Sequence, residues 1–255
     1  MKESALISRQ YGPLSVLERE PAGKDPEKTL TIVLAHGFGA NGWDVSPIAD
    51  SIDEERRFRW LFPHAPMSLA AAAGQPEITN DDFRQEIGRA WFPRTTEELK
   101  RALFGDFFAH IAEQAPATLH SAGEELLSMI AAARGVASLA DVVIGGFSQG
   151  AMTAIESILT ADDTPAALLV LSGNPIDERR WSELFRNYPQ RHENCTVRYF
   201  QSHGTGDPIL SYAEARRLNE MLSSAGMAGE FHSFPGGHGI PEQILLALSE
   251  FLFTI

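Results

Sequence analysis

The chain has 255 residues, of which 44 % are hydrophobic and 22 % charged, so it can bury a core without disulfides or a structural metal. Acidic residues outnumber basic ones 34 to 21, and the net charge of −13 disfavours binding to nucleic acid or to an anionic membrane surface. The single cysteine, Cys195, excludes an internal disulfide and a thiolate metal cluster.

The first twenty residues carry charges throughout and contain no apolar stretch of the kind that a signal peptide needs. Nowhere does the chain hold 18 or more consecutive apolar residues, the length typical of a membrane-spanning helix. We therefore expect a cytoplasmic protein with no stable membrane insertion.

Short apolar runs along the chain predict strands. Runs at residues 5–11 and 14–17 are separated by Gly12 and Pro13, which predicts a hairpin at the edge of a sheet. Later runs are continuous and β-branched, as in strands that are covered on both faces. These runs lie at residues 30–35, 58–62, 142–144, 167–171, 197–201 and 230–234.

Helical periodicity separates these strands. Apolar residues three and four apart predict helices at residues 119–133, 151–159, 212–222 and 242–253. Strands that alternate with helices indicate a mostly parallel central sheet with helices on both faces. Because no repeat and no linker interrupts the pattern, we expect one α/β domain over residues 1–255.

Residues 67–114 break the alternation. This long insertion carries several phenylalanines at helix-compatible spacing, interrupted by Gly105, and insertions of this length in compact domains are usually functional. It leaves the sheet at the carboxyl edge, so we predict a lid whose Met67, Trp91 and Phe92 contact the substrate. Residues 104–108 would either join this lid or pack in the core.

The strongest chemical motif is Gly-Phe-Ser-Gln-Gly at residues 146–150. It lies between a predicted strand and a predicted helix, which is the context of a nucleophile elbow. The sharp turn exposes Ser148, its glycines avoid backbone clashes, and the helix N-terminus directs free N–H groups to the site. We therefore predict that Ser148 is a nucleophile; the alternative is a glycine-rich turn with an incidental serine.

A nucleophilic serine needs a base, and the base needs an acid that orients it. In this kind of sheet the acid and then the histidine follow the nucleophile, each on a loop after a later strand. Asp207 and His238 occupy such glycine-flanked loops, so we predict them as acid and base. Asp177 is the competing acid, but it begins a charged run that is typical of an exposed helix start.

Backbone N–H groups from the residue after the nucleophile and from an early strand–helix loop stabilise the oxyanion in such sites. Gln149 and Phe38, the latter within His-Gly-Phe-Gly at residues 36–39, occupy these positions. The other histidines show no metal-ligand spacing, so we predict no metal and no cofactor. His203 and Asp207 could together chelate an ion, but a catalytic acid explains Asp207 better.

With these motifs the chain resembles the phospholipase/carboxylesterase group of α/β-hydrolases, which includes acyl-protein thioesterases and small bacterial carboxylesterases. The matching segments are HGFG at 36–39, PHAP at 63–66, AWF at 90–92, GGFSQG at 145–150, LSG at 171–173, HG and DP within 203–208, and GH at 237–238. The resemblance implies the α/β-hydrolase fold, a Ser148–Asp207–His238 triad, and oxyanion donors at Phe38 and Gln149. Ala40 stands where the family usually has an acidic residue, and Pro93 where it usually has aspartate.

We predict a serine hydrolase that cleaves carboxylic esters, thioesters or lysophospholipids through an acyl-enzyme on Ser148. An acyl-protein thioesterase, an acyltransferase or a peptidase with the same triad are alternatives, because a fold does not fix its substrate. A non-catalytic binding protein on this scaffold would be expected to lack a triad member. The expected partner is a small-molecule ester or thioester substrate. The sequence also leaves open whether the protein forms a homodimer.

Overall fold

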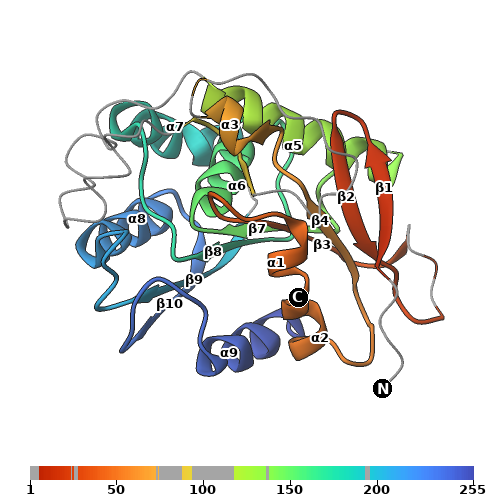
Figure 1. Ribbon diagram of the computed structural model, residues 1–255. Helices are drawn as coiled ribbons and strands as arrows, with labels where there is room; N and C mark the ends of the chain where they lie inside the picture. Colours follow the sequence, from red (N-terminus) through yellow and green to blue (C-terminus); the bar gives the residue numbers. More distant parts are fainter. Residues whose placement is uncertain are drawn as a thin grey trace.

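An eight-stranded sheet forms the centre of the protein (Figure 1). The computed structural model describes residues 6–23, 25, 28–72, 74, 88–93, 118–135, 138–192 and 196–255. The strands of the sheet are β1 (Ile7–Tyr11), β2 (Leu14–Arg19), β3 (Thr31–Ala35), β4 (Arg59–Pro63), β7 (Val142–Phe147), β8 (Ala167–Leu171), β9 (Arg198–Gly204) and β10 (Ala228–Phe234). Their order is β1-β2-β4-β3-β7-β8-β9-β10. Strands β1 and β2 pair antiparallel and β2 runs antiparallel to β4, whereas the pairs from β4 to β10 are parallel.

Helices cover both faces of this sheet (Figure 1). One face carries α5 (Thr118–Arg134), α6 (Gln149–Thr160), α7 (Glu178–Arg191) and α8 (Tyr212–Ser224). The other face carries α1 (Gly42–Val45), α2 (Pro47–Ile52) and α9 (Glu242–Leu252). A short α3 (Leu69–Ala72) follows β5 (Met67–Ser68), which pairs with β6 (Arg89–Ala90) in a second, two-stranded sheet. No helix in the described ranges is both long and apolar enough to cross a membrane.

The parallel strands are apolar without interruption because both of their faces are buried. In β3, Val33 packs into the core beneath α5 and α6, while its neighbours Ile32 and Leu34 pack into the core beneath α9. Successive side chains of a strand point to opposite faces, so a strand between two helical layers needs an apolar residue at every position. The prediction of a mostly parallel sheet between two helical layers is confirmed.

The predicted strands and helices all begin and end within three residues of the observed ones, and the hairpin forms the β1 edge of the sheet. The short helices α1, α2 and α3 were not predicted, because four to six residues are too few to show a helical period. Helix α7 was foreseen only as a helix start near Asp177. Of the predicted lid at 67–114, residues 73, 75–87 and 94–114 lie outside the described residues, as does the segment 104–108.

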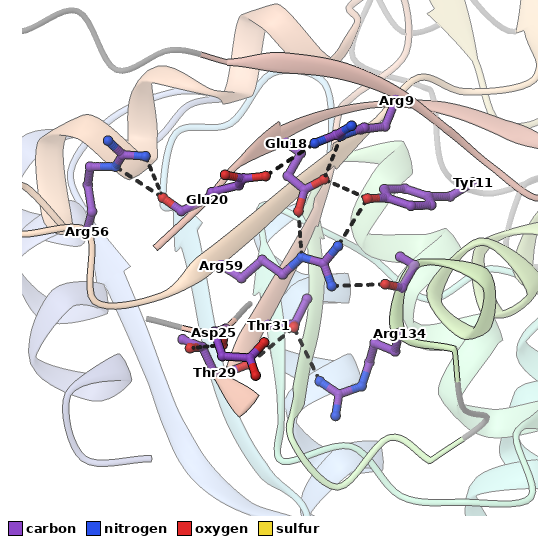
Figure 2. A network of polar contacts seen from close by, with 11 residues as sticks. Arg9, Tyr11, Glu18, Glu20, Asp25, Thr29, Thr31, Arg56, Arg59 and Arg134 are labelled. Atoms are coloured by element: carbon purple, nitrogen blue, oxygen red, sulfur yellow. Dashed lines mark hydrogen bonds and ion pairs between the residues drawn. The ribbon is translucent and has the colours of Figure 1, made fainter. Parts of the chain in front are cut away.

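Buried charges connect the antiparallel edge to the parallel part of the sheet (Figure 2). Glu18 on β2 and Arg59 on β4 are 2 % and 4 % exposed, and their side chains form an ion pair at 2.7 Å. The Tyr11 hydroxyl donates to the other Glu18 oxygen at 2.6 Å and accepts from Arg59 at 3.1 Å. Arg59 also donates to the Ala133 carbonyl at 3.0 Å, at the end of α5. One guanidinium therefore ties the hairpin, the central sheet and a covering helix together.

Replacing Arg59 by Met should lower the free energy of unfolding by about 3–5 kcal/mol, because Glu18 would stay buried without its nearer cation and would keep only the partly exposed Arg9, at 3.5 Å, among the described residues. Lys28→Met removes an exposed ion pair with Asp25 and is the matched control, expected to cost about 0–1 kcal/mol. Urea denaturation of both variants measures the difference. Equal stability of the two variants would contradict a structural role for the buried pair.

Candidate active site

Ser148 lies on a strained turn between β7 and α6. Its backbone angles, φ 56° and ψ −117°, lie in a region that side-chain-bearing residues rarely adopt. The Ser148 N–H donates to the Leu171 carbonyl at 2.9 Å, and its carbonyl accepts from Ala151 at 3.0 Å. These bonds hold the turn against its strain. The side chain is half-buried, so it is open to a reaction partner.

Two glycines permit this turn because other backbone lies against them. A Cβ on Gly146 would lie 2.4 Å from the carbonyl carbon of Gly150. A Cβ on Gly150 would lie 2.3 Å from the Ala35 oxygen, at the end of β3. Since real Cβ atoms do not approach this closely, both motif glycines are explained by contact rather than by flexibility.

The loop after β3 runs beside the elbow. A Cβ on Gly37 would lie 3.2 Å from the Phe147 ring and 3.4 Å from the Ser148 Cβ. Phe38 follows on this loop, while Gln149 opens α6, where the first N–H groups of a helix have no partner within the helix. The two residues predicted as oxyanion donors therefore lie on the two segments that adjoin Ser148.

The Gln149 side chain connects this region to residues 91 and 92. Its oxygen accepts from the Trp91 N–H and its nitrogen donates to the Phe92 carbonyl, both at 2.8 Å. The Trp91 indole N–H donates to the His36 carbonyl at 2.9 Å. Trp91 and Phe92 are 1 % and 0 % exposed, so their described role is to hold the loop after β3 and the start of α6. The sequence does not predict these hydrogen bonds, although the Trp-Phe and Ser-Gln motifs contain the residues that form them.

Strand β6 extends the same support. The Gly39 N–H donates to the Arg89 carbonyl at 2.9 Å, and the Arg89 N–H donates to the Ala40 carbonyl at 2.8 Å. Arg89 also donates through its guanidinium to the carbonyls of Ala65 and Pro66. Met67 lies next to these residues on β5 and is half-buried, so its predicted contact with substrate stays a prediction.

Asp207 follows β9 and its carboxylate is buried and fully hydrogen-bonded. Oδ1 accepts from the N–H groups of Ile209 and Leu210 at 2.8 and 2.9 Å. Oδ2 lies 2.7 Å from His238 Nδ1 and 3.2 Å from His203 Nε2. Burial alone would raise the pKa of Asp207, but the hydrogen bonds from His203, His238 and Leu210 outweigh it and hold that pKa well below its usual range. Asp207 is therefore ionised throughout the neutral range.

His238 follows β10, and its loop is fastened to the Asp207 loop. The N–H groups of Thr205 and Gly206 donate to the carbonyls of Phe234 and Gly236, both at 2.9 Å. The His238 ring packs on the Phe147 ring with centroids 4.8 Å apart, and Phe147 directly precedes Ser148. The structure thus pairs the predicted acid and base and brings the base beside the elbow.

Asp177, the competing acid, has a different task. Its carboxylate accepts from the Arg180 N–H at 3.3 Å, and it caps the N-terminus of α7. This contact agrees with the prediction of a helix start. It gives Asp177 a local structural role.

His36 and His64 both bond to backbone groups, and His64 Nδ1 accepts from the Gly42 N–H at 3.2 Å. His36 Nδ1 donates to the Gly37 carbonyl at 2.7 Å and its Nε2 accepts from the Ala65 N–H at 3.0 Å. Burial lowers the pKa of His36 to about 4 and that of His64 to about 3, so both are neutral at pH 7. Within the described ranges, no group of three or more His, Cys, Asp or Glu side chains could hold a metal ion.

Known proteins resemble the chain over most of its length. The family model described as phospholipase/carboxylesterase matches residues 21–255. Acyl-protein thioesterase 1 of Neurospora crassa is 28 % identical over 234 residues, which cover 88 % of this chain and 86 % of that protein. Carboxylesterase SOBER1 of Arabidopsis thaliana is 26 % identical, with 84 % of this chain and 85 % of that protein covered.

Solved structures show the same fold. The crystal structure of esterase PE8 superposes with a TM-score of 0.69 at 23 % identity, over 96 % of this chain and 98 % of that one. The carboxylesterase from Bacillus cereus superposes with a TM-score of 0.60 at 19 % identity, over 94 % of both chains. Together with the family match over residues 21–255, the sheet order and the elbow show that the chain belongs to the phospholipase/carboxylesterase family of α/β-hydrolases.

Proposed function

We propose that the protein is a serine hydrolase that cleaves carboxylic esters or thioesters through an acyl-enzyme on Ser148. The observation that carries this proposal is the His238–Asp207 hydrogen bond of 2.7 Å beside the strained serine turn. A buried, ionised carboxylate that holds a histidine beside the turn of a half-buried serine is the arrangement that activates serine as a nucleophile.

The proposed mechanism assigns one proton transfer to each step. His238 Nδ1–H donates to Asp207, which leaves Nε2 to accept the Ser148 proton as Oγ attacks the carbonyl carbon. The oxyanion that forms accepts from the N–H groups of Phe38 and Gln149. His238 then returns its proton to the leaving alcohol or thiol, and water releases the acyl group by the same two steps.

The substrate class follows from the relatives rather than from the triad. Relatives named acyl-protein thioesterase 1 and carboxylesterase SOBER1 support ester and thioester substrates, and lysophospholipids remain within this class. Hydrolysis rates for p-nitrophenyl esters of increasing acyl length, compared with an acyl thioester, distinguish these substrates. Acyl transfer to an acceptor other than water would indicate a transferase. The cytoplasmic location, the homodimer and the absence of a cofactor stay predictions.

Ser148→Ala should abolish ester hydrolysis while the protein stays folded, because only binding and the oxyanion donors would remain to accelerate the reaction. Labelling by a fluorophosphonate, followed by peptide mapping, should place the phosphonate on Ser148. Ser51→Ala on α2 is the control and should keep full activity. Label on another residue would overturn the assignment.

Asp207→Asn should lower kcat by about 10²–10⁴-fold, because His238 would lose the anion that orients it. Asp177→Asn is the matched control and should leave kcat unchanged, since asparagine caps a helix as well as aspartate does. Steady-state kinetics on one p-nitrophenyl ester measures both. A larger loss for Asp177→Asn would make Asp177 the acid.

Trp91→Phe should lower stability by about 1–3 kcal/mol, because the buried His36 carbonyl would lose its donor. Since Trp91 is only 1 % exposed, the preferred acyl length should not change. Met67→Ala at the half-buried β5 position should shift that preference if Met67 contacts the acyl chain. Melting temperatures and acyl-length profiles of both variants test these expectations, and a shifted profile for Trp91→Phe would instead support the predicted substrate contact.

A further inference from the structure

A second histidine contacts the proposed catalytic acid. His203 lies near the end of β9, four residues before Asp207, and its side chain is 0 % exposed. Its Nε2 lies 2.8 Å from the Leu210 carbonyl and 3.2 Å from Asp207 Oδ2. The proposed mechanism gives this imidazole no task.

The contacts of His203 determine which of its ring nitrogens carries the hydrogen. A carbonyl oxygen and an ionised carboxylate can only accept, so His203 Nε2 must carry a hydrogen. That nitrogen donates to the Leu210 carbonyl at 2.8 Å and lies 3.2 Å from Asp207 Oδ2. The other ring nitrogen, Nδ1, is buried and makes no hydrogen bond within the described part of the chain. An apolar side chain would fill this space without burying an unpaired nitrogen. What the imidazole adds at this position is therefore its Nε2–H.

We propose that His203 is a positioning residue for the catalytic acid, in which its Nε2–H and the Nδ1–H of His238 share Asp207 Oδ2. This inference rests on the proposed triad. With two backbone donors on Oδ1 and two imidazole donors on Oδ2, the carboxylate cannot rotate without losing several bonds at once. His203 also draws negative charge away from Oδ2, which tempers the stabilisation of a protonated His238.

The groups that face His203 come from its own loop and from two further elements. Asp207 lies on its own loop, His238 follows β10 and meets the same carboxylate, and the Tyr212 ring on α8 lies with its centroid 6.4 Å from the His203 ring. The uncharged Ser233 on β10 lies beside His203 in the register of the sheet. Asp207 is the carboxylate that contacts His203 among the described residues.

Two amide substitutions at His203 test whether the position of the N–H donor matters, apart from the presence of a polar side chain. His203→Gln can bring its amide nitrogen to about the position of Nε2, whereas the shorter amide of His203→Asn reaches only to about the position of Nδ1. The Asn variant should lower kcat by about 10–100-fold with little change in KM, because a misplaced acid disorients the base. The acidic limb of its kcat/KM profile should move to higher pH by about half a unit, since the charge left on Oδ2 favours protonated His238. The Gln variant should stay close to the parent protein.

The measurement is p-nitrophenyl butyrate hydrolysis between pH 5 and pH 9, with active sites counted by fluorophosphonate labelling. His192→Asn is the control, because His192 is also a buried histidine with an unpaired ring nitrogen, at the end of α7 away from Asp207. A purely structural role would lower the number of labelled sites without moving the acidic limb. An unmoved limb in His203→Asn, or an equal loss in both His203 variants, would overturn the inference.

A second readout needs no change at His203. Nitrogen-15 spectra of histidine-labelled parent protein should show His203 with its hydrogen on Nε2, and Asp207→Asn should shift that resonance. A hydrogen on Nδ1, or an unshifted resonance, contradicts the proposal even where His203→Asn does not fold. If Ser148→Ala keeps its activity, the proposed triad fails, whereas normal His203→Asn kinetics alongside an inactive Ser148→Ala protein rejects only the role of His203.

Discussion

The strained backbone of Ser148 is the constraint on which the rest of the site depends. A residue held at φ 56° keeps that angle only when its surroundings leave no alternative. Here β3 and the first turn of α6 lie so close to Gly146 and Gly150 that a single Cβ would collide with backbone. The turn therefore cannot relax without separating the central strands from the helix that follows them. The packing of the sheet and of α6 therefore balances the backbone strain at Ser148.

The sequence predicts the fold well because the parallel strands are covered on both faces. Uninterrupted apolar runs such as residues 167–171 stand out from the amphipathic helices between them, and all five residues of β8 are buried. The loops after such strands meet at one edge of the sheet, so the neighbourhood of Ser148, Asp207 and His238 follows from strand order alone.

The sequence does not predict the side-chain contacts that support the site. Gln149 and Trp91 are 58 residues apart, and no periodicity relates them. His203 is only four residues from Asp207, yet whether its ring faces the carboxylate depends on rotamers that β9 and α8 select. A helix as short as α1 is also not predicted from the sequence. Its position depends on the Asn41 cap and on contacts to β4 rather than on a periodic pattern.

The hydrogen bonds around Gln149 make residues 88–93 a support of the proposed reaction centre. Gln149 and the loop after β3 are both fastened to Trp91 and Phe92, and β6 adds a further pair of bonds to that loop. A ligand that displaced this short segment would have to break those bonds, and so it would move the segments that carry the proposed oxyanion donors Phe38 and Gln149. Linkage is reciprocal, so a compound that mimics that intermediate would in turn tighten the hold on residues 88–93. Inhibitor affinity and the order of this segment are therefore two measures of one coupling free energy.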